Sequence, residues 1–249
     1  MDFPAEDVFG NVKKLKFILE HVELHRQRIG RDPVVLDFGC GNGAGVAAFI
    51  IPKVKRYVGV DIHAPSLAYA HQNFAAPNAT FGTSIPNDVM FDIIIFADVL
   101  EHVHDPLGVL SKPLPQLADD GIMIGSVPNG YGPCEIEKYV DHRLHLYGML
   151  RWVKRTALAL MGKPRKEPPG IPYNHESGHV IFFTMRSLRN MINAAGLKIV
   201  AFRHAGFVGA DLTGNVITSR RFVEWNVRVS DRLPSWMVSA WYFVLARKA

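Results

Sequence analysis

The sequence predicts one three-layer α/β domain, in which helices cover both faces of a mostly parallel β-sheet. Short apolar runs alternate with helical periodicity through the first half of the 249 residues, a pattern typical of strand–helix–strand units with right-handed crossovers. A glycine-rich turn directly follows the first apolar run. The length suits one large domain with insertions, and 48% hydrophobic residues are enough to form a sizeable core.

The first half begins with a helix and continues as alternating strands and helices. Apolar residues in 11–28 recur at the 3–4 spacing of one helix face, and Gly30 and Pro33 mark its end. The strands are short apolar runs without that period, as expected for strands buried on both faces. The predicted strands are 34–38, 57–61, 79–84, 91–98 and 121–127. The predicted helices are 44–50, 66–74 with Ser66 as its N-cap, and a proline-interrupted helix within 105–118.

The second half contains an insertion, at about 131–178, before the pattern returns. Residues 184–202 read as a helix capped by Thr184, a stop at Gly196 and a strand. A helix at 222–233 and a last strand at 239–247 follow. We therefore expect a single domain over 1–249 that carries this insertion.

The insertion has an amphipathic stretch, 144–163, and a Pro/Gly-rich segment, 163–172, which should be a loop. Apolar residues of the stretch can form one helix face, with arginines and lysines beside it. Four interpretations stay open: a lid over a substrate site, a dimer contact, an interfacial helix that contacts a membrane or lipid-linked substrate, or a helix packed on the core.

Composition narrows the cellular context and the partners. The two cysteines, Cys40 and Cys134, are no disulfide framework, so a reducing cytoplasm is expected. The N-terminal residues lack the order of a signal peptide, and every apolar run is too short to span a bilayer. The net charge of +5 fits an acidic substrate, a nucleic acid or an anionic membrane and selects none of them. The sequence leaves the oligomeric state open.

The candidate ligand-binding residues lie where the first two predicted strands end. The run from Asp37 to Gly45 holds four glycines after a strand, which allows close approach of a ligand to the backbone and to the next helix N-terminus. Asp61 ends the next strand, where a carboxylate can accept hydrogen bonds from both hydroxyls of a ribose. Together they predict a nucleoside-bearing ligand at the carboxyl edge of the sheet.

The identity of that nucleoside depends on Asp37. Gly39, Gly41 and Ala44 satisfy the dinucleotide pattern, with Asp61 near the expected distance, so an NAD(P)-dependent oxidoreductase is one interpretation. A carboxylate beside the loop would repel a pyrophosphate, however, whereas it tolerates or favours a sulfonium and an ammonium group. Asp37 therefore favours S-adenosylmethionine, although it could also serve only to bind amides of the loop.

Four segments resemble a known family. VVLDFGCGNG (34–43) resembles the first motif of class I S-adenosylmethionine-dependent methyltransferases. FDIIIFADVLEHVHDP (91–106) is similar to the fourth-strand region of the subgroup that includes the ubiquinone-biosynthesis O-methyltransferases. GIMIGSVPNGYG (121–132) and the segment 179–200 resemble that subgroup's fifth strand and its later His…Phe-Thr…Ala-Gly region. Four motifs in the right order are more specific than one glycine loop.

The resemblance implies a Rossmann-like seven-stranded sheet whose last strand is antiparallel, and 239–247 fits that strand. It also implies roles for the residues at the ends of the strands. Thr83 or Ser84 lies where many members have an Asp at the adenine edge. The cofactor-binding residues expected in this way are Asp37, Gly39, Cys40, Gly41, Gly43, Asp61, Ile62, Thr83, Ser84, Ala97, Asp98 and Val99.

Methyl transfer is an in-line displacement that depends mainly on alignment of donor and acceptor, and a hydroxyl acceptor needs a general base. Histidine titrates in the right range. The candidate bases are His102, His142, His145, His175 and His179. Asn129 and Tyr131 follow the fifth strand and are expected to shape the acceptor site. For the pair Glu101–His102 we favour a role in capping or bracing the next helix, and alone the pair predicts no metal site.

We therefore expect a methyltransferase that uses S-adenosylmethionine and a small-molecule acceptor, with an oxygen nucleophile suggested by the subgroup. Besides the nicotinamide enzyme, a non-catalytic protein that binds S-adenosylmethionine stays open. A nucleic-acid substrate is disfavoured, because the Pro128-Asn129 turn lacks the Asn-Pro-Pro-Tyr-like pattern of many base-modifying enzymes. Nor does a basic run with interleaved aromatic residues stand out beyond the insertion.

Overall fold

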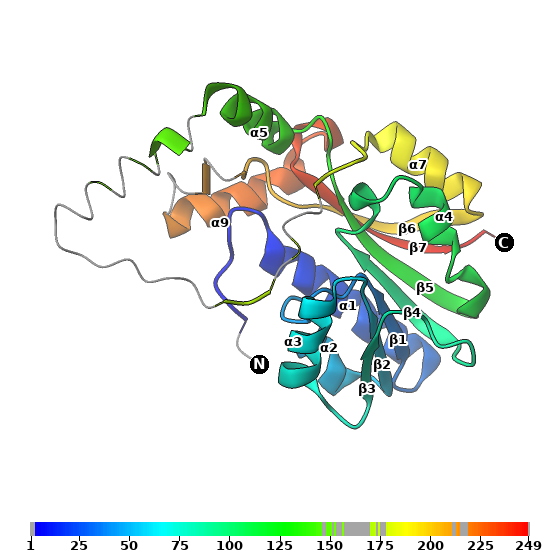
Figure 1. Ribbon diagram of the computed structural model, residues 1–249. Coiled ribbons are helices and arrows are strands. Elements are labelled where there is room, and N and C mark those ends of the chain that lie inside the picture. Colours follow the sequence, from blue (N-terminus) through cyan, green and yellow to red (C-terminus); the bar gives the residue numbers. More distant parts are fainter. Residues whose placement is uncertain are drawn as a thin grey trace.

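A mixed seven-stranded sheet forms the centre of the molecule (Figure 1). The computed structural model describes residues 3–145, 148–150, 152, 156, 170–172, 174, 178–210, 213–214 and 219–248. In spatial order the strands are β3 (Ala79–Gly82), β2 (Arg56–Val60), β1 (Val34–Phe38), β4 (Phe91–Ala97), β5 (Leu117–Pro128), β7 (Ala240–Arg247) and β6 (Leu197–His204). Strand β7 runs antiparallel to both neighbours, and the other described pairs are parallel. The predicted fold class is confirmed.

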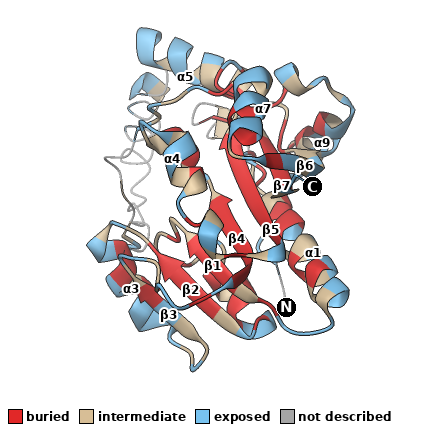
Figure 2. Cartoon of the chain, turned by 90° about the vertical axis from the view of Figure 1, so that its right-hand side faces the viewer, coloured by how far each residue is buried: buried red, intermediate tan, exposed pale blue. Residues whose placement is uncertain are grey.

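Helices cover both faces of the sheet, and their buried faces define two apolar clusters. Apolar side chains of α1 (Asn11–Ile29), α2 (Ala47–Ile50) and α3 (Ala64–Phe74) pack on one face. Those of α4 (Pro106–Ser111) and α7 (Met185–Ala194) pack on the other. The central strands are largely buried between these layers, whereas edge strand β6 exposes Val200 and Phe202, and the helices expose their outer faces (Figure 2). The nearly continuous burial of the central strands explains why they read as apolar runs rather than as alternating patterns.

Two further helices lie beyond the carboxyl ends of the strands. Helix α5 (Pro133–Leu144) follows β5, and α9 (Arg220–Val229) precedes β7 and lies near it (Figure 1). The Asn226 side chain of α9 donates to the carbonyls of Val8 and Val208, so α9 anchors both the N-terminal segment and the chain that follows β6. No helix in the described parts of the chain is long and apolar enough to cross a membrane.

Most predicted boundaries agree with the structure, and three need correction. Helix α2 begins only at Ala47, since the glycine-rich turn extends further than expected. Ser66 is not an N-cap, because α3 already begins at Ala64 with a proline in its first turn, and the Ser66 hydroxyl is buried against His63 Nδ1 at 2.7 Å. Strand β5 begins at Leu117, which pairs with Phe91 ahead of a register shift. The predicted cap at Thr184 is confirmed as a capping box with Ser187.

Candidate active site

The glycine-rich loop and Asp61 are in direct contact at the carboxyl edge of the sheet. The backbone N–H of Gly41 donates to Asp61 Oδ2 at 2.8 Å, and the N–H of His63 donates to Oδ1 at 2.8 Å. The first turn of the loop is fixed as well, because the N–H groups of Gly39 and Cys40 both donate to the carbonyl of Val60. Each carboxylate oxygen has a second lone pair, so Asp61 retains two acceptor positions after binding these amides.

The glycines of the loop adopt conformations that other residues rarely take. Gly39, Gly41 and Gly43 have φ angles of 79°, 54° and 77°, in the left-handed region. A Cβ on Gly39 would lie 2.5 Å from a methyl group of Val99, so the loop packs tightly on the segment that follows β4. A Cβ on Gly41 would meet nothing within 4 Å. The loop therefore packs against Val99 at Gly39, whereas at Gly41 its backbone is accessible to a ligand.

Asp37 belongs to strand β1, directly before the glycine-rich loop, and its side chain is buried. The residue is 1% exposed, and its carboxylate accepts a hydrogen bond of 2.6 Å from the Tyr57 hydroxyl on the neighbouring strand. Burial raises the pKa of Asp37 to about 7, although the Tyr57 hydrogen bond opposes the shift and the charge of Asp61 adds to it. Tyr57 was not foreseen from the sequence. The Asp37 carboxylate contacts a strand partner, and its predicted role toward a ligand stays a prediction.

Cys40 is held in the same buried layer. Its Sγ lies 3.7 Å from the Gly41 carbonyl, and a Cβ on Gly59 would come within 2.9 Å of that sulfur. Burial, followed by the negative charges of Asp37 and Asp61, raises the pKa of the Cys40 thiol. A thiol that resists ionisation is a poor nucleophile, which agrees with a packing role for this residue.

The expected adenine side presents exposed residues next to Asp61. Ile62 has 88% of its surface exposed, an unusual state for an isoleucine at the end of a buried strand. Thr83 and Ser84 are exposed after β3, and a Cβ on Gly82 would meet nothing within 4 Å. These positions therefore border an open edge beside the Asp61 carboxylate.

A charged cluster follows β4 at the same edge. The Asp98 carboxylate, on a residue with a φ of 57°, is bound by the Lys14 ammonium and by the Ser126 hydroxyl. Burial disfavours the charged form of Asp98, but these two partners overcome it and hold its pKa below the ordinary value. Ala97 and Val99 flank it, half-buried. The sequence carries no signal for Lys14, because α1 brings it to Asp98 from 84 residues away.

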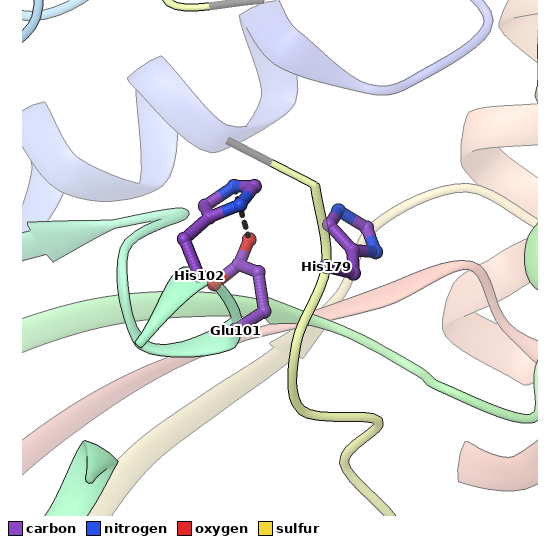
Figure 3. Close-up of side chains that lie close together, drawn as sticks. All are labelled: Glu101, His102 and His179. Carbon is purple, nitrogen blue, oxygen red and sulfur yellow. Dashed lines mark ion pairs between the residues drawn. The ribbon is translucent and has the colours of Figure 1, made fainter. Parts of the chain in front are cut away.

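The candidate bases separate into groups in the structure. His102 and His179 meet, with their ring centroids 5.1 Å apart (Figure 3). His142 and His145 form a second, exposed pair near the end of α5, with centroids 6.4 Å apart. His175 lies outside the described residues. Only the first pair therefore adjoins the loop after β4 that the resemblance places at the cofactor edge.

Glu101 and Glu135 surround the His102–His179 pair, and sequence reasoning gave Glu135 no role. The Glu101 side chain is buried, and burial followed by the charge of Asp98 raises its pKa well above the ordinary value. Glu135 Oε1 lies 3.3 Å from His179 Nδ1 and accepts from Lys138 at 2.7 Å. Burial opposes ionisation of Glu135, but His179 and Lys138 hold its pKa below its ordinary value.

The two predicted acceptor residues differ in their surroundings. Asn129 is buried, and its Nδ2 donates to the backbone carbonyls of Trp236 and Val238, while its Oδ1 accepts from the Tyr131 amide. These bonds fix the turn after β5. The Tyr131 side chain is 68% exposed on that turn. Asn129 thus shapes the backbone here, and contact of either residue with an acceptor stays a prediction.

One described piece of the insertion returns to the glycine-rich loop. The Pro172 carbonyl accepts a hydrogen bond from Asn42 Nδ2 at 3.1 Å and one from the Ser66 hydroxyl at 3.4 Å. Asn42 belongs to the loop and Ser66 to the first turn of α3. The end of the 163–172 segment therefore lies against the expected cofactor edge rather than away from it.

Comparison with protein families decides between the interpretations. Residues 13–201, more than half of the chain, match the family model described as a methyltransferase domain. The chain belongs to this family. The expectation of an enzyme of the methyltransferase class is thereby confirmed, and S-adenosylmethionine is the cofactor that the family supports. The nicotinamide interpretation loses its basis, since the glycine pattern and the spacing to Asp61 on which it rested are both accounted for by the methyltransferase family.

Individual relatives of this methyltransferase are distant. Two ubiquinone biosynthesis O-methyltransferases, from Rickettsia bellii strains OSU 85-389 and RML369-C, are each 28% identical to it over 125 residues. That stretch is 48% of this chain and 51% of each relative, so the chain spans about half the length of the curated relatives it matches.

Solved structures with the same fold include a 1,6-didemethyltoxoflavin-N1-methyltransferase from Burkholderia thailandensis. It is 16% identical, with a TM-score of 0.51, and the match covers 100% of this methyltransferase and 94% of that chain. The magnesium protoporphyrin IX methyltransferase from Synechocystis PCC 6803 is also 16% identical, with a TM-score of 0.53 and coverage of 100% and 90%. Both were solved with bound S-adenosylhomocysteine. At this identity the likeness establishes the fold.

Proposed function

We propose that this methyltransferase transfers the methyl group of S-adenosylmethionine to a hydroxyl of a small molecule. The contact between the glycine-rich loop and Asp61 carries the proposal, because it puts a carboxylate with two unused acceptor positions beside an open backbone cradle. These features fit an adenosine: Asp61 would accept from the ribose hydroxyls, and exposed Ile62 would cover the adenine. When bound, the cofactor supplies a methyl group already activated on a sulfonium.

The chain's own residues would hold and align the reactants. The loop from Gly39 to Gly43 would bind the methionine part through its backbone, and Thr83 and Ser84 would border the adenine edge. Ala97, Asp98 and Val99 would form the wall after β4, which Lys14 braces. Such positioning contributes several kcal/mol to a displacement reaction, since it replaces an encounter of two free molecules.

His179 is the best-supported base among the candidates for removal of the acceptor proton. The Glu135 carboxylate at its Nδ1 orients the ring and stabilises the cation formed when Nε2 accepts a proton. His102 lies beside it, whereas His142 and His145 lie exposed on α5. The O-methyltransferase names of the Rickettsia relatives support an oxygen acceptor, while the Burkholderia structure is named for methylation of a nitrogen.

We further propose that residues 170–172, the described piece of the insertion beside the glycine-rich loop, lie over the bound reactants; most of the predicted amphipathic stretch 144–163 lies outside the described residues. The hydrogen bonds from Asn42 and Ser66 to Pro172 support this interpretation over a dimer contact, because they connect the insertion to the cofactor edge of its own chain. Exclusion of water by such a segment would protect the reacting groups.

The test combines binding and turnover. S-adenosylhomocysteine is titrated calorimetrically into the wild type, and NAD and NADP serve as comparison ligands. A panel of phenols, carboxylic acids and amines is then incubated with S-adenosylmethionine, and S-adenosylhomocysteine release is measured. The proposal expects binding of S-adenosylhomocysteine alone and release with at least one hydroxyl compound. Release with amines only would overturn the oxygen assignment, and binding without any turnover would favour a non-catalytic protein.

The base assignment is tested by the pH profile of turnover with an active hydroxyl acceptor. His179→Gln should lower kcat with little change in KM for S-adenosylmethionine and should remove the acid limb that a histidine base produces. His142→Gln is the matched control on α5 and should keep both kcat and the profile. If the two variants behave alike, His179 is not the base.

A further inference from the structure

Two adjacent lysines at the start of α1 have different surroundings. Lys14 contacts the Asp98 carboxylate, which follows β4. The Lys13 ammonium instead has four oxygen acceptors between the end of β6 and the turn after α9: the carbonyls of Ala205 and Val227, the Ser230 hydroxyl and Asp231 Oδ1. These acceptors satisfy all three N–H groups of Lys13, which therefore fastens α1 to the chain around α9.

The Lys14 ammonium is mostly buried but is not saturated in the same way. Its side chain is 16% exposed, and within the described parts of the chain its Nζ hydrogen-bonds to Asp98 alone. An ammonium has three N–H groups, so two of them find no acceptor among the described residues. Burial disfavours the charged form of Lys14, but the charge and hydrogen bond of Asp98 outweigh it and raise the Lys14 pKa. The group is thus a charged donor with unused capacity.

This donor lies at the edge of the sheet that we assign to the cofactor. Asp98, its partner, directly follows β4, and the next residue, Val99, packs on Gly39 of the glycine-rich loop. The charge of Glu101, in the turn after β4, also acts on Lys14. The ammonium is therefore close both to the wall beside the cofactor and to that turn.

The candidate base His179 lies against the same turn. The N–H groups of Val180 and Ile181 donate to the backbone carbonyl of Glu101 at 2.8 and 3.0 Å, which fixes the segment that carries His179. An acceptor hydroxyl placed between the cofactor wall and His179 would therefore lie near the Lys14 ammonium.

The start of α1 is itself held in place. The Tyr242 hydroxyl of β7 donates to the Gly10 carbonyl at 2.9 Å, and Glu6 Oε1 accepts from the Val12 amide at 2.9 Å. Lys14 follows directly on this anchored turn. Donors whose position is fixed before the reaction stabilise a developing charge best, because they need no reorganisation.

We propose that the Lys14 ammonium donates a hydrogen bond to the acceptor oxygen and stabilises the negative charge that develops there during methyl transfer. The inference rests on the proposed function. The acceptor O–H proton passes to His179 Nε2, an oxygen lone pair forms the bond to the methyl carbon, and the C–S bond breaks with its electron pair left on sulfur. Asp98 orients the ammonium and offsets part of its charge, so Lys14 acts as a directed donor rather than as a free cation.

Ionisation of a coloured phenol tests the proposal without methyl transfer. 4-Nitrophenol is titrated with base in the presence of the full chain and S-adenosylhomocysteine, and its phenolate absorption is recorded. We expect the bound phenol to have an apparent pKa about 1 lower than the free phenol, as an opposite charge in contact causes. Lys14→Met should abolish this difference and Lys14→Arg should retain it. Lys16→Met, which removes an exposed lysine of α1, is the matched control and should behave as wild type.

Turnover with the hydroxyl acceptor found in the panel gives a second, independent measurement. Lys14→Met should lower kcat about 100-fold, the loss typical of one oxyanion donor, with little change in KM for S-adenosylmethionine. Raising the pH should recover part of this loss, because a more basic solution ionises the acceptor without help from Lys14. A merely structural role would lower kcat alike at every pH, and Lys14→Arg would not restore it.

Three results would overturn the proposal. They are an unshifted nitrophenol titration with the wild type, a kcat of Lys14→Met equal to that of the wild type, and loss of calorimetric S-adenosylhomocysteine binding in Lys14→Met, which would place Lys14 at the cofactor instead. A nitrophenol shift that depends on Lys14, without turnover of any acceptor, would contradict the proposed function and leave the assignment of Lys14 standing.

Discussion

Asp37 should make the stability of the protein depend on pH in a way that one substitution removes. The group is buried, and its pKa is raised from 3.8 to about 7 in the folded chain. The unfolded chain loses this proton near pH 4, and the folded chain keeps it until near pH 7. Unfolding therefore releases a proton between these values, so the contribution of Asp37 to stability is present at low pH and is lost as the pH rises.

The size of the effect follows from the shift. About three pKa units at about 1.4 kcal/mol per unit correspond to about 4 kcal/mol, of which about 2.5 kcal/mol falls between pH 5 and pH 8. In Asp37→Asn the side-chain oxygen still accepts from Tyr57, but the ionisable group is gone. The free energy of unfolding of Asp37→Asn should therefore rise relative to wild type by about 2.5 kcal/mol from pH 5 to pH 8.

Urea denaturation at pH 5, 6, 7 and 8 measures this difference, since other titrating groups are common to both proteins and largely cancel. Asp88→Asn, an exposed carboxyl in the loop before β4, is the control and should run parallel to wild type at every pH. A constant difference between Asp37→Asn and wild type across this range would refute the reasoning, because it would mean that Asp37 titrates alike in both states.

The other predictions concern binding and the core. Asp61→Ala should weaken S-adenosylhomocysteine about 100-fold by calorimetry, since two hydrogen bonds to a charged acceptor are worth about 3 kcal/mol together; unchanged affinity would exclude the ribose contact. Asn42→Ala should raise KM for the acceptor by opening the Pro172 contact, with the circular dichroism spectrum unchanged; an unaltered KM would argue against a lid. Arg31→Met should lower the free energy of unfolding, measured in urea at pH 7, by about 2 kcal/mol, because the buried Asp92 carboxylate loses its cation and keeps only the hydrogen bond from the Val34 amide. That loss should shrink as the pH falls through the lowered pKa of Asp92, and a loss of equal size at pH 3 would contradict it.

Features that depend on neighbours along the chain were predictable from the sequence. The spacing of apolar residues predicts the buried face of α1 and the order of strands and helices. The residue types at helix ends predict the cap at Thr184. The adjacency of the glycine-rich loop and Asp61 follows too, because parallel strands end at a common edge. These local rules also explain the error at Ser66: its side chain can cap a helix, but Pro65 allows the helix to begin earlier.

Contacts between distant segments were not predictable in the same way. Lys14 meets Asp98, and His179 meets His102 and Glu135, only because the sheet and α5 bring their segments together. Nothing in the local sequence of these residues distinguishes them from solvated surface groups. Burial of Glu101 is equally invisible, since a Glu-His pair after a strand reads as a helix brace until the segment before α7 covers it.

The most direct measurement is a crystal structure of the wild type with S-adenosylhomocysteine. We expect both ribose hydroxyls within hydrogen-bond distance of the Asp61 carboxylate, the adenine against Ile62, and the homocysteine part along the Gly39–Gly43 backbone. A ligand bound elsewhere, or a ribose that does not touch Asp61, would contradict the assignment of this edge as the cofactor site.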